Sequence, residues 1–226
     1  MAVSKERMAE LEQILKDTAP AITRIEYPPE IMAYQELAGR TVLTMNAAGH
    51  DFKVYCVTAK HREADGPLFI NIHGGGWVIG HKDNDTCYAA WLAEALHSVV
   101  LDVDYTTSDI APWSVMFEQC CEAVRYAFAH CEELGCDRNR ISVGGYSAGG
   151  HLTAGIALWA AQNHYPLALQ VLCYAPLDLR KRELPPAATE QARKQQARGR
   201  CFDELLFRND DQLRLQPFAC PVMAAD

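Results

Sequence analysis

The chain has 226 residues, which is enough for one large domain or two small ones. Its proportions of hydrophobic residues (49%) and charged residues (22%) are typical of a globular protein. The net charge of −8 argues against nucleic acid or an anionic membrane as a partner, because both bind clustered Lys and Arg. No apolar run approaches the ~18 residues of a membrane span, and the charged N-terminus lacks the apolar core of a signal peptide.

The nine cysteines match neither a Cys-x-x-Cys motif nor the spacing of a zinc site. Several lie within apolar runs, as Cys173 does between Leu172 and Tyr174. An odd number of cysteines in such positions indicates buried free thiols in a reducing compartment. We therefore expect a cytoplasmic protein.

The first part of the chain predicts one peripheral helix and then three strands. An apolar stripe at helical spacing predicts the amphipathic helix: Met8, Leu11, Ile14 and Leu15. Residues 41–45 and 52–58 are typical of strands, and the turn-rich stretch between them suits a hairpin. Residues 67–72 are apolar on both faces, which predicts a central strand.

Helices alternate with buried strands in the rest of the chain. The predicted helices span about 85–97, 114–134 and 147–161, and the predicted strands span 98–103, 141–143 and 168–174. The first of these helices has its large apolar residues at helical spacing: Tyr88, Trp91, Leu92, Ala95 and Leu96. Gly135 is well placed to cap the second. The alternation predicts a parallel sheet with helices on both faces, and residues from about 184 to 209 predict an inserted helical segment.

The pentapeptide Gly145-Tyr146-Ser147-Ala148-Gly149 follows a strand and precedes a helix, which is the layout of a nucleophile elbow. A serine hydroxyl is a weak nucleophile unless a sharp turn exposes it and a nearby base takes its proton. The turn crowds the backbone, so the positions two before and two after the serine need glycine. Ser147 is therefore the candidate nucleophile.

A second motif, His73-Gly74-Gly75-Gly76-Trp77, directly follows the strand predicted over 67–72. Acyl transfer places negative charge on the carbonyl oxygen, and backbone N–H groups stabilise that charge. Glycines let the backbone turn its N–H groups into a cavity without Cβ atoms in the way. We expect Gly74, Gly75 and Ala148 to form an oxyanion hole; a plain strand-to-loop turn is the alternative.

The two motifs together resemble the hormone-sensitive-lipase-like branch of the α/β-hydrolases, which are mostly bacterial carboxylesterases acting on short acyl chains. The resemblance extends from about Val42 to Ala225 and includes three supporting segments: 104–105, 137–141 and 174–178. The chain departs from the pattern at 106–109, where relatives usually have Arg-Leu-Ala-Pro-Glu. It also has Tyr146 where Asp is common. His151 follows the second glycine, as in similar enzymes that remove acyl groups from carbohydrates or drug-like esters.

The resemblance implies an α/β-hydrolase fold with a mostly parallel central sheet and helices on both faces. It implies one domain over 1–226, incomplete at its C-terminus, with cap elements over 1–40 and about 184–209. In this family the nucleophile is followed by an acid and then a histidine, each at the end of a further strand. By analogy, neither strand is present, and neither the acid nor the histidine base is in this chain.

Residues within the chain are poor substitutes for that acid and base. His73 belongs to the glycine loop, and His151 lies one turn after Ser147 with its side chain expected to point away. Asp178 resembles a structural position, and Asp226 falls just short of the acid-bearing strand. The other histidines are expected in loops or near helix ends: His50, His61, His81, His97, His130 and His164.

The strand over 168–174 becomes the edge of the sheet if no further strand follows it. It contains no charge or proline to discourage pairing with another chain. We therefore expect this edge to be covered by a second copy of the chain or by a complementing C-terminal polypeptide.

These features favour a serine carboxylesterase that hydrolyses short-chain acyl esters, including acetylated or aryl-ester carbohydrates and small esters. The chemistry needs no metal and no organic cofactor, and Trp77 and Tyr146 are either walls of the substrate pocket or simple packing. The alternative is a catalytically incomplete fragment or a pseudoenzyme that binds a small ligand. A peptidase is a weaker third option, because nothing suggests a peptide-binding groove.

Overall fold

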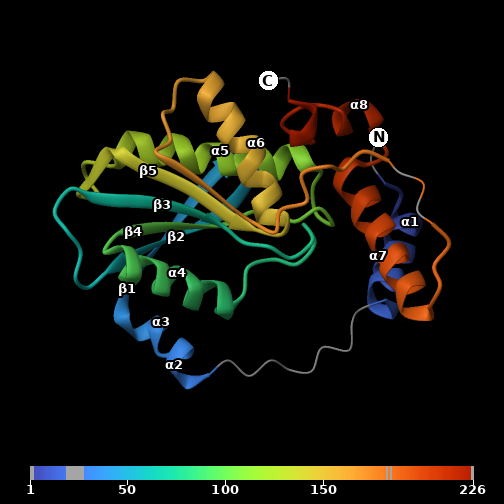
Figure 1. The fold of residues 1–226 in the computed structure, drawn as a ribbon, viewed down its shortest axis with the longest axis horizontal. Coiled ribbons are helices and arrows are strands. Elements are labelled where there is room, and N and C mark those ends of the chain that lie inside the picture. The colour runs from blue at the N-terminus through green and yellow to red at the C-terminus, as the bar shows by residue number, and fades with distance from the viewer. Residues whose placement is uncertain (1–2, 19–27, 182, 184, 225–226) are drawn as a thin grey trace.

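The computed structural model describes residues 3–18, 28–181, 183 and 185–224. Its centre is a six-stranded sheet in the order β1-β2-β4-β3-β5-β6 (Figure 1). The strands are β1 (Ala38–Ala47), β2 (His50–Ala59), β3 (Gly66–Ile72), β4 (Val99–Asp104), β5 (Cys136–Tyr146) and β6 (Leu169–Cys173). β4, β3, β5 and β6 run parallel, while β1 and β2 are antiparallel, so the predicted mostly parallel α/β sheet is confirmed. Asp226 and residues 19–27 of the predicted cap lie outside the described residues.

Helices cover the two faces of the sheet unequally (Figure 1). α5 (Trp113–His130) and α6 (Ala148–Gln162) lie on one face, and α4 (Asp83–Leu96) lies on the other. The short helices α2 (Pro29–Met32) and α3 (Tyr34–Leu37) pack beside α4. The chain steps along the sheet in one direction from β3 to β4, and in the opposite direction from β4 to β5 and on to β6. Because each of these crossovers is right-handed, the helix of the first crossover lies on one face and the helices of the other two lie on the opposite face.

The predicted hairpin between the first two strands is confirmed. β1 and β2 are joined at Ala48 and Gly49, whose φ angles of 51° and 78° are both left-handed. Two left-handed residues make the tight turn whose twist matches that of the flanking strands. β3 lies between β4 and β5, as its apolar faces predict.

Two helices differ from the sequence prediction. α4 buries its small residues, including Ala89, Ala90 and Ala93, whereas Trp91 and Leu96 are 42% and 41% exposed. Small residues let the helix approach the sheet closely, and the large side chains lie to the side. α5 ends at His130, not at residue 134, and Gly135 (φ 64°) instead turns the chain into β5.

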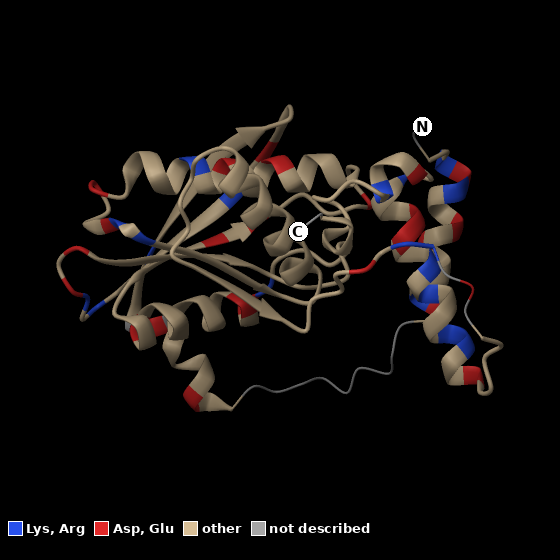
Figure 2. Ribbon diagram, turned by 45° about the horizontal axis from the view of Figure 1, so that its top comes forward, with Lys and Arg blue, Asp and Glu red and all other residues tan. Residues whose placement is uncertain are grey.

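A separate pair of helices lies at one end of the molecule. α1 (Lys5–Asp17) packs against α7 (Glu190–Phe207) around Leu11, Cys201 and Leu205. The Arg7 guanidinium donates to both carboxylate oxygens of Glu204 at 2.9 and 2.8 Å. Figure 2 shows that charged residues are dense on these two helices and sparse on the sheet. The predicted N-terminal helix and the helical nature of the inserted segment are confirmed, and α8 (Asp211–Arg214) and the short 3-10 helix η1 (Pro221–Met223) follow it.

β6 is the last strand of the sheet, so the prediction of an edge at this strand is confirmed, but the prediction that it is buried is wrong. Leu169 and Leu172, which point to opposite faces, are 58% and 37% exposed. β5 is the only strand paired with β6 among the described residues.

All nine cysteines lie in the described ranges and none forms a disulfide there, as predicted; eight are buried and Cys173 is partly exposed. In the described ranges, no helix is long and apolar enough to cross a membrane.

Candidate active site

Ser147 occupies a strained turn between β5 and α6. Its φ of 53° and ψ of −122° are rare for a residue with a side chain, and such strain costs of order 1–3 kcal/mol. The Ser147 amide donates to the Cys173 carbonyl at the end of β6 (2.9 Å), and the Ser147 carbonyl accepts from the His151 amide (3.0 Å). The elbow is therefore fixed on both sides, with Ser147 partly exposed.

Two glycines allow this turn to pack against the end of β3. A Cβ atom at Gly145 would lie 2.6 Å from the Ile72 carbonyl oxygen and from the Gly149 backbone. A Cβ atom at Gly149 would clash with the carbonyl oxygens of Ile72 and His73. Both glycines are thus required by close backbone contact, as the sequence predicts.

The glycine loop after β3 lies against the same turn. Gly75, Gly76 and Trp77 all have positive φ angles, of 119°, 60° and 64°. The Ile79 amide donates to the Gly75 carbonyl at 3.0 Å, which closes the loop. Gly75 and Gly76 are partly exposed, whereas Gly74 is buried. The loop is therefore a tight turn whose second and third glycines face the surface beside the elbow.

The loop is anchored at its start by His73, which is 1% exposed. Its ring stacks on Tyr105 with centroids 4.3 Å apart, and the Tyr105 hydroxyl donates to the His73 carbonyl at 3.1 Å. Burial lowers the pKa of His73, so this imidazole is neutral near pH 7. These contacts give His73 a structural place beneath the loop.

The far end of the loop is anchored by His81, whose role was not apparent from the sequence. Its Nε2 lies 2.5 Å from Oδ2 of Asp102, a fully buried carboxylate on β4. Asn71 donates to the other oxygen of Asp102 at 2.7 Å. Desolvation acts to lower the pKa of His81, but the hydrogen bond and charge of Asp102 outweigh it and raise the pKa. Asp102 within an apolar strand was the available signal, because a buried carboxylate needs partners.

His151 and Trp77 form a buried pair behind the elbow. The Trp77 indole N–H donates to Nδ1 of His151 (3.2 Å), and Nε2–H of His151 donates to the Ala219 carbonyl (2.9 Å). His151 is fully buried and Trp77 is 7% exposed. Both ring nitrogens of His151 are thus engaged away from Ser147, and Trp77 packs inside the molecule.

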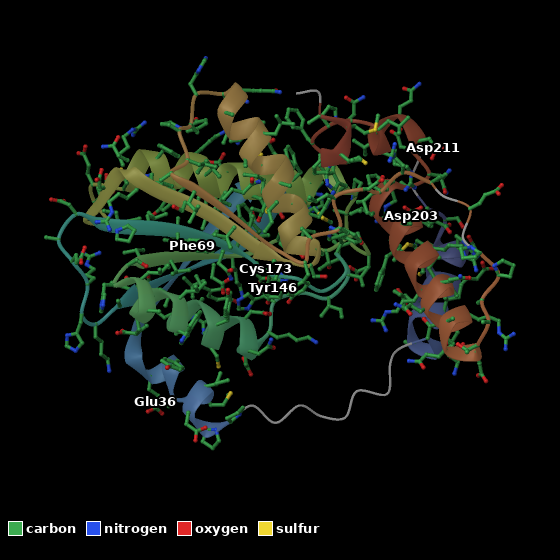
Figure 3. All side chains as sticks on the ribbon, viewed as in Figure 1. Glu36, Phe69, Tyr146, Cys173, Asp203 and Asp211 are labelled. Atoms are coloured by element: carbon green, nitrogen blue, oxygen red, sulfur yellow. The ribbon has the colours of Figure 1, made fainter. Side chains whose placement is uncertain are left out.

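Tyr146 lies at the carboxyl end of β5, directly opposite Cys173 of β6, and Figure 3 shows the two side by side. It lines a cavity of about 660 Å³ on the α4 side of the sheet. The walls are mostly aromatic and apolar: Ile31, Tyr34, Cys87, Tyr88, Trp91, Cys173 and Tyr174, with Glu30 and Asn84. Within the described residues, the Ser147 hydroxyl makes no hydrogen bond to a histidine or a carboxylate. The Asp178 carboxylate instead pairs with Arg180.

A strained serine between a parallel strand and a helix, beside a glycine loop on the neighbouring strand, defines an α/β-hydrolase. Residues 69–226 match the model of a protein family that is described as having the α/β-hydrolase fold. The chain belongs to this family.

Similar proteins are named as esterases and lipases. Carboxylesterase NlhH of Mycobacterium tuberculosis is 30% identical over 172 residues, which are 76% of this chain and 53% of that protein. Hormone-sensitive lipase of Bos taurus is 36% identical over 94 residues, 42% of this chain and 12% of that protein. The chain spans about half the length, or less, of the first curated relatives that it matches.

Solved structures confirm the fold. A hyperthermophilic esterase from the archaeon Pyrobaculum calidifontis superposes on the whole of this chain with a TM-score of 0.75, at 22% identity and over 76% of that chain. A fungal esterase from Rhizomucor miehei superposes on 94% of this chain with a TM-score of 0.72, at 22% identity and over 72% of that chain.

Proposed function

We propose that the chain carries the nucleophile half of a carboxylic ester hydrolase, with Ser147 forming the acyl-enzyme. The observation that carries this proposal is the strained backbone of Ser147 (φ 53°), held over the end of β3 by glycines at 145 and 149. Strain of this kind persists only where the surrounding structure enforces it, and it is concentrated at functional sites. The esterase names of the relatives support the same chemistry.

Backbone amides near Ser147 would hold the oxyanion. Gly75 and Ala148 remain the proposed donors. Gly74 is a weaker candidate than the sequence indicates, because the Tyr146 ring packs directly against it. We propose Gly76, which is partly exposed in the same loop, as the third donor in its place.

The proposed substrates are short-chain acyl esters, including acetylated or aryl-ester carbohydrates and small esters. The proposed cap over the site consists of α1 and α7, because the Phe202 ring of α7 packs against the glycine loop. A Cβ atom added at Gly76 would lie only 2.7 Å from the nearest carbon of this ring. On this view residues 1–226 belong to one domain, and the cap elements fall within 1–40 and about 184–209. We also propose a reducing, cytoplasmic location, which fits the free thiols.

Labelling of Ser147 tests the proposed function. The wild-type chain, together with the polypeptide that is proposed below to supply the acid and the histidine base, is incubated with a fluorophosphonate probe and with p-nitrophenyl acetate, beside the same assembly carrying Ser147→Ala. We expect the probe to modify Ser147, and we expect Ser147→Ala to lose both labelling and ester turnover. If wild type and variant behave alike in both assays, the chain is a pseudoenzyme or an incomplete fragment, and the proposal is wrong.

We further propose that the acid and the histidine base come from outside these 226 residues, on a polypeptide that covers β6. The exposed side chains of β6 and the cavity beside Tyr174, itself 78% exposed, mark this uncovered region. A parallel strand is stable when both of its faces and its edge are covered. A second copy of the chain would cover the same edge when no complementing polypeptide is present.

Self-association at this edge can be measured by sedimentation velocity over a range of concentrations. We expect the isolated wild-type chain to associate, and the Leu169→Lys/Leu172→Lys variant to shift toward monomer, because lysines on an edge strand oppose pairing. Lys substitution of exposed Leu96, outside β6, is the matched control. A wild-type chain that stays monomeric at every concentration would contradict a self-pairing edge.

A further inference from the structure

The side chain next to the nucleophile joins three parts of the site. The Tyr146 ring lies on the glycine loop, so close that a Cβ atom at Gly74 would be 2.9 Å from two of its carbons. The Tyr146 hydroxyl donates to Oδ1 of Asp85, in the first turn of α4. One side chain thus contacts the elbow, the glycine loop and α4.

Asp85 is a fixed partner for this hydroxyl. Its side chain is buried, with 5% of the residue exposed, and its Oδ2 accepts from the Lys82 amide at 2.7 Å. Asn84 adds a longer contact to Oδ1 at 3.4 Å. A buried carboxylate is costly without donors, so the Tyr146 hydroxyl and the start of α4 stabilise it together.

The hydrogen bond to Asp85 matters for the loop. Because the Tyr146 hydroxyl is bonded to Asp85, the ring that carries it is held in one orientation against Gly74. Burial, and then the hydrogen bond that the hydroxyl donates to Asp85, raise the pKa of Tyr146 far above its ordinary value, so the hydroxyl keeps its proton at working pH. The Gly74 peptide is thereby packed against a ring whose neutral hydroxyl is held by Asp85.

We propose that Tyr146 and Asp85 are a positioning pair: they fix the Gly74 peptide and so set the orientation of the amides that follow it, next to Ser147. This inference rests on the proposed function and adds to it. A nucleophile elbow and an oxyanion loop come from different strands, β5 and β3, and a side-chain connection adds to the backbone packing that places them together. Tyr146 supplies that connection from the residue adjacent to the nucleophile.

Tyr146→Phe tests the pair, since it keeps the ring on Gly74 and removes only the hydroxyl. Tyr88→Phe is the matched control, because the Tyr88 ring meets Tyr146 edge-on at 5.8 Å and belongs to the same helix as Asp85. Hydrogen exchange is followed by mass spectrometry in the peptide covering residues 73–80. We expect exchange there to be about tenfold faster in Tyr146→Phe, and unchanged in Tyr88→Phe.

Kinetics with p-nitrophenyl acetate, measured on the chain together with the polypeptide that supplies the acid and the base, provide the second readout. A misplaced oxyanion donor acts in the transition state, so we expect kcat to fall about 10–100-fold in Tyr146→Phe with KM within about twofold. Asp85→Asn should have a similar effect, and the double variant should cost no more than either single change, because the two groups act as one unit.

The outcomes separate the pair from the proposed function. Loop exchange that is equal in wild type and Tyr146→Phe, or equally fast in Tyr88→Phe, would overturn the positioning pair. An unchanged kcat despite faster exchange would also overturn it. If wild type fails to turn over the ester at all, the proposed function fails, while a difference in loop exchange between the two Phe variants still supports the pair.

Discussion

Gly149→Ala is expected to destabilise the fold by about 4 kcal/mol or more, because its methyl group has no space. The added carbon would clash with the carbonyl oxygens of Ile72 and His73 at the end of β3. These neighbours are backbone atoms of the last residue of a central strand and of the residue after it, so they cannot move aside as a flexible side chain does. Changes that overpack a rigid core are among the few that cost this much.

Urea unfolding measures this cost, and Gly199→Ala is the matched control. Gly199 lies within the exposed helix α7, where an added methyl meets nothing within 4 Å. Alanine there should stabilise the protein by about 0.5–1 kcal/mol, because glycine is a poor helix former. A cost for Gly149→Ala below about 1 kcal/mol would show that α6 can move away from β3, contrary to the packing of the elbow.

The elements of the fold were predictable because they leave local patterns. The stripe on α1, the apolar run of β3 and the turn between β1 and β2 depend on residues close in sequence. The glycines at 145 and 149 were predictable for the same reason, because a sharp strand-to-helix turn restricts its own neighbours. Such features need no knowledge of the sheet order.

Burial on α4 and β6 was less predictable, because it depends on what lies opposite. Trp91 and Leu169 look like core residues in the sequence, yet both are largely exposed. α4 faces the sheet with alanines, and β6 has no strand beyond it among the described residues. An apolar side chain is buried only where a neighbour covers it, and the local sequence does not contain the neighbour.

The polar contacts of the site were the least predictable part. Tyr146 and Asp85 are separated by 61 residues, and His81 and Asp102 by 21. Each pair forms only after the strands adopt their order, since β4 and β5 lie on either side of β3. The packing of the Tyr146 ring on Gly74 was unpredictable for the same reason, because the motif places this tyrosine next to the nucleophile but does not orient its side chain.

Acid is expected to weaken the fold through His151. Burial lowers the pKa of this imidazole to about 4, and the hydrogen bond to Ala219 offsets only part of that effect. Protonation at Nδ1 would oppose the Trp77 N–H, which already donates to that atom. The unfolded chain, with an ordinary pKa near 6.5, binds the proton more readily than the folded protein.

The sign of the effect follows from this difference. The stability that the lowered pKa of His151 contributes is fully present above about pH 6.5 and is lost as the pH falls toward about 4. Between pH 7 and pH 5 the loss in the free energy of unfolding is about 2 kcal/mol. Other groups titrate in the same range, so the informative quantity is the comparison with His151→Gln, whose amide can still donate to the Ala219 carbonyl. We expect the free energy of unfolding of wild type to fall by about 2 kcal/mol more than that of His151→Gln over this interval. Parallel losses in the two proteins would mean that His151 binds its proton equally well in both states, which its burial between Trp77 and Ala219 opposes.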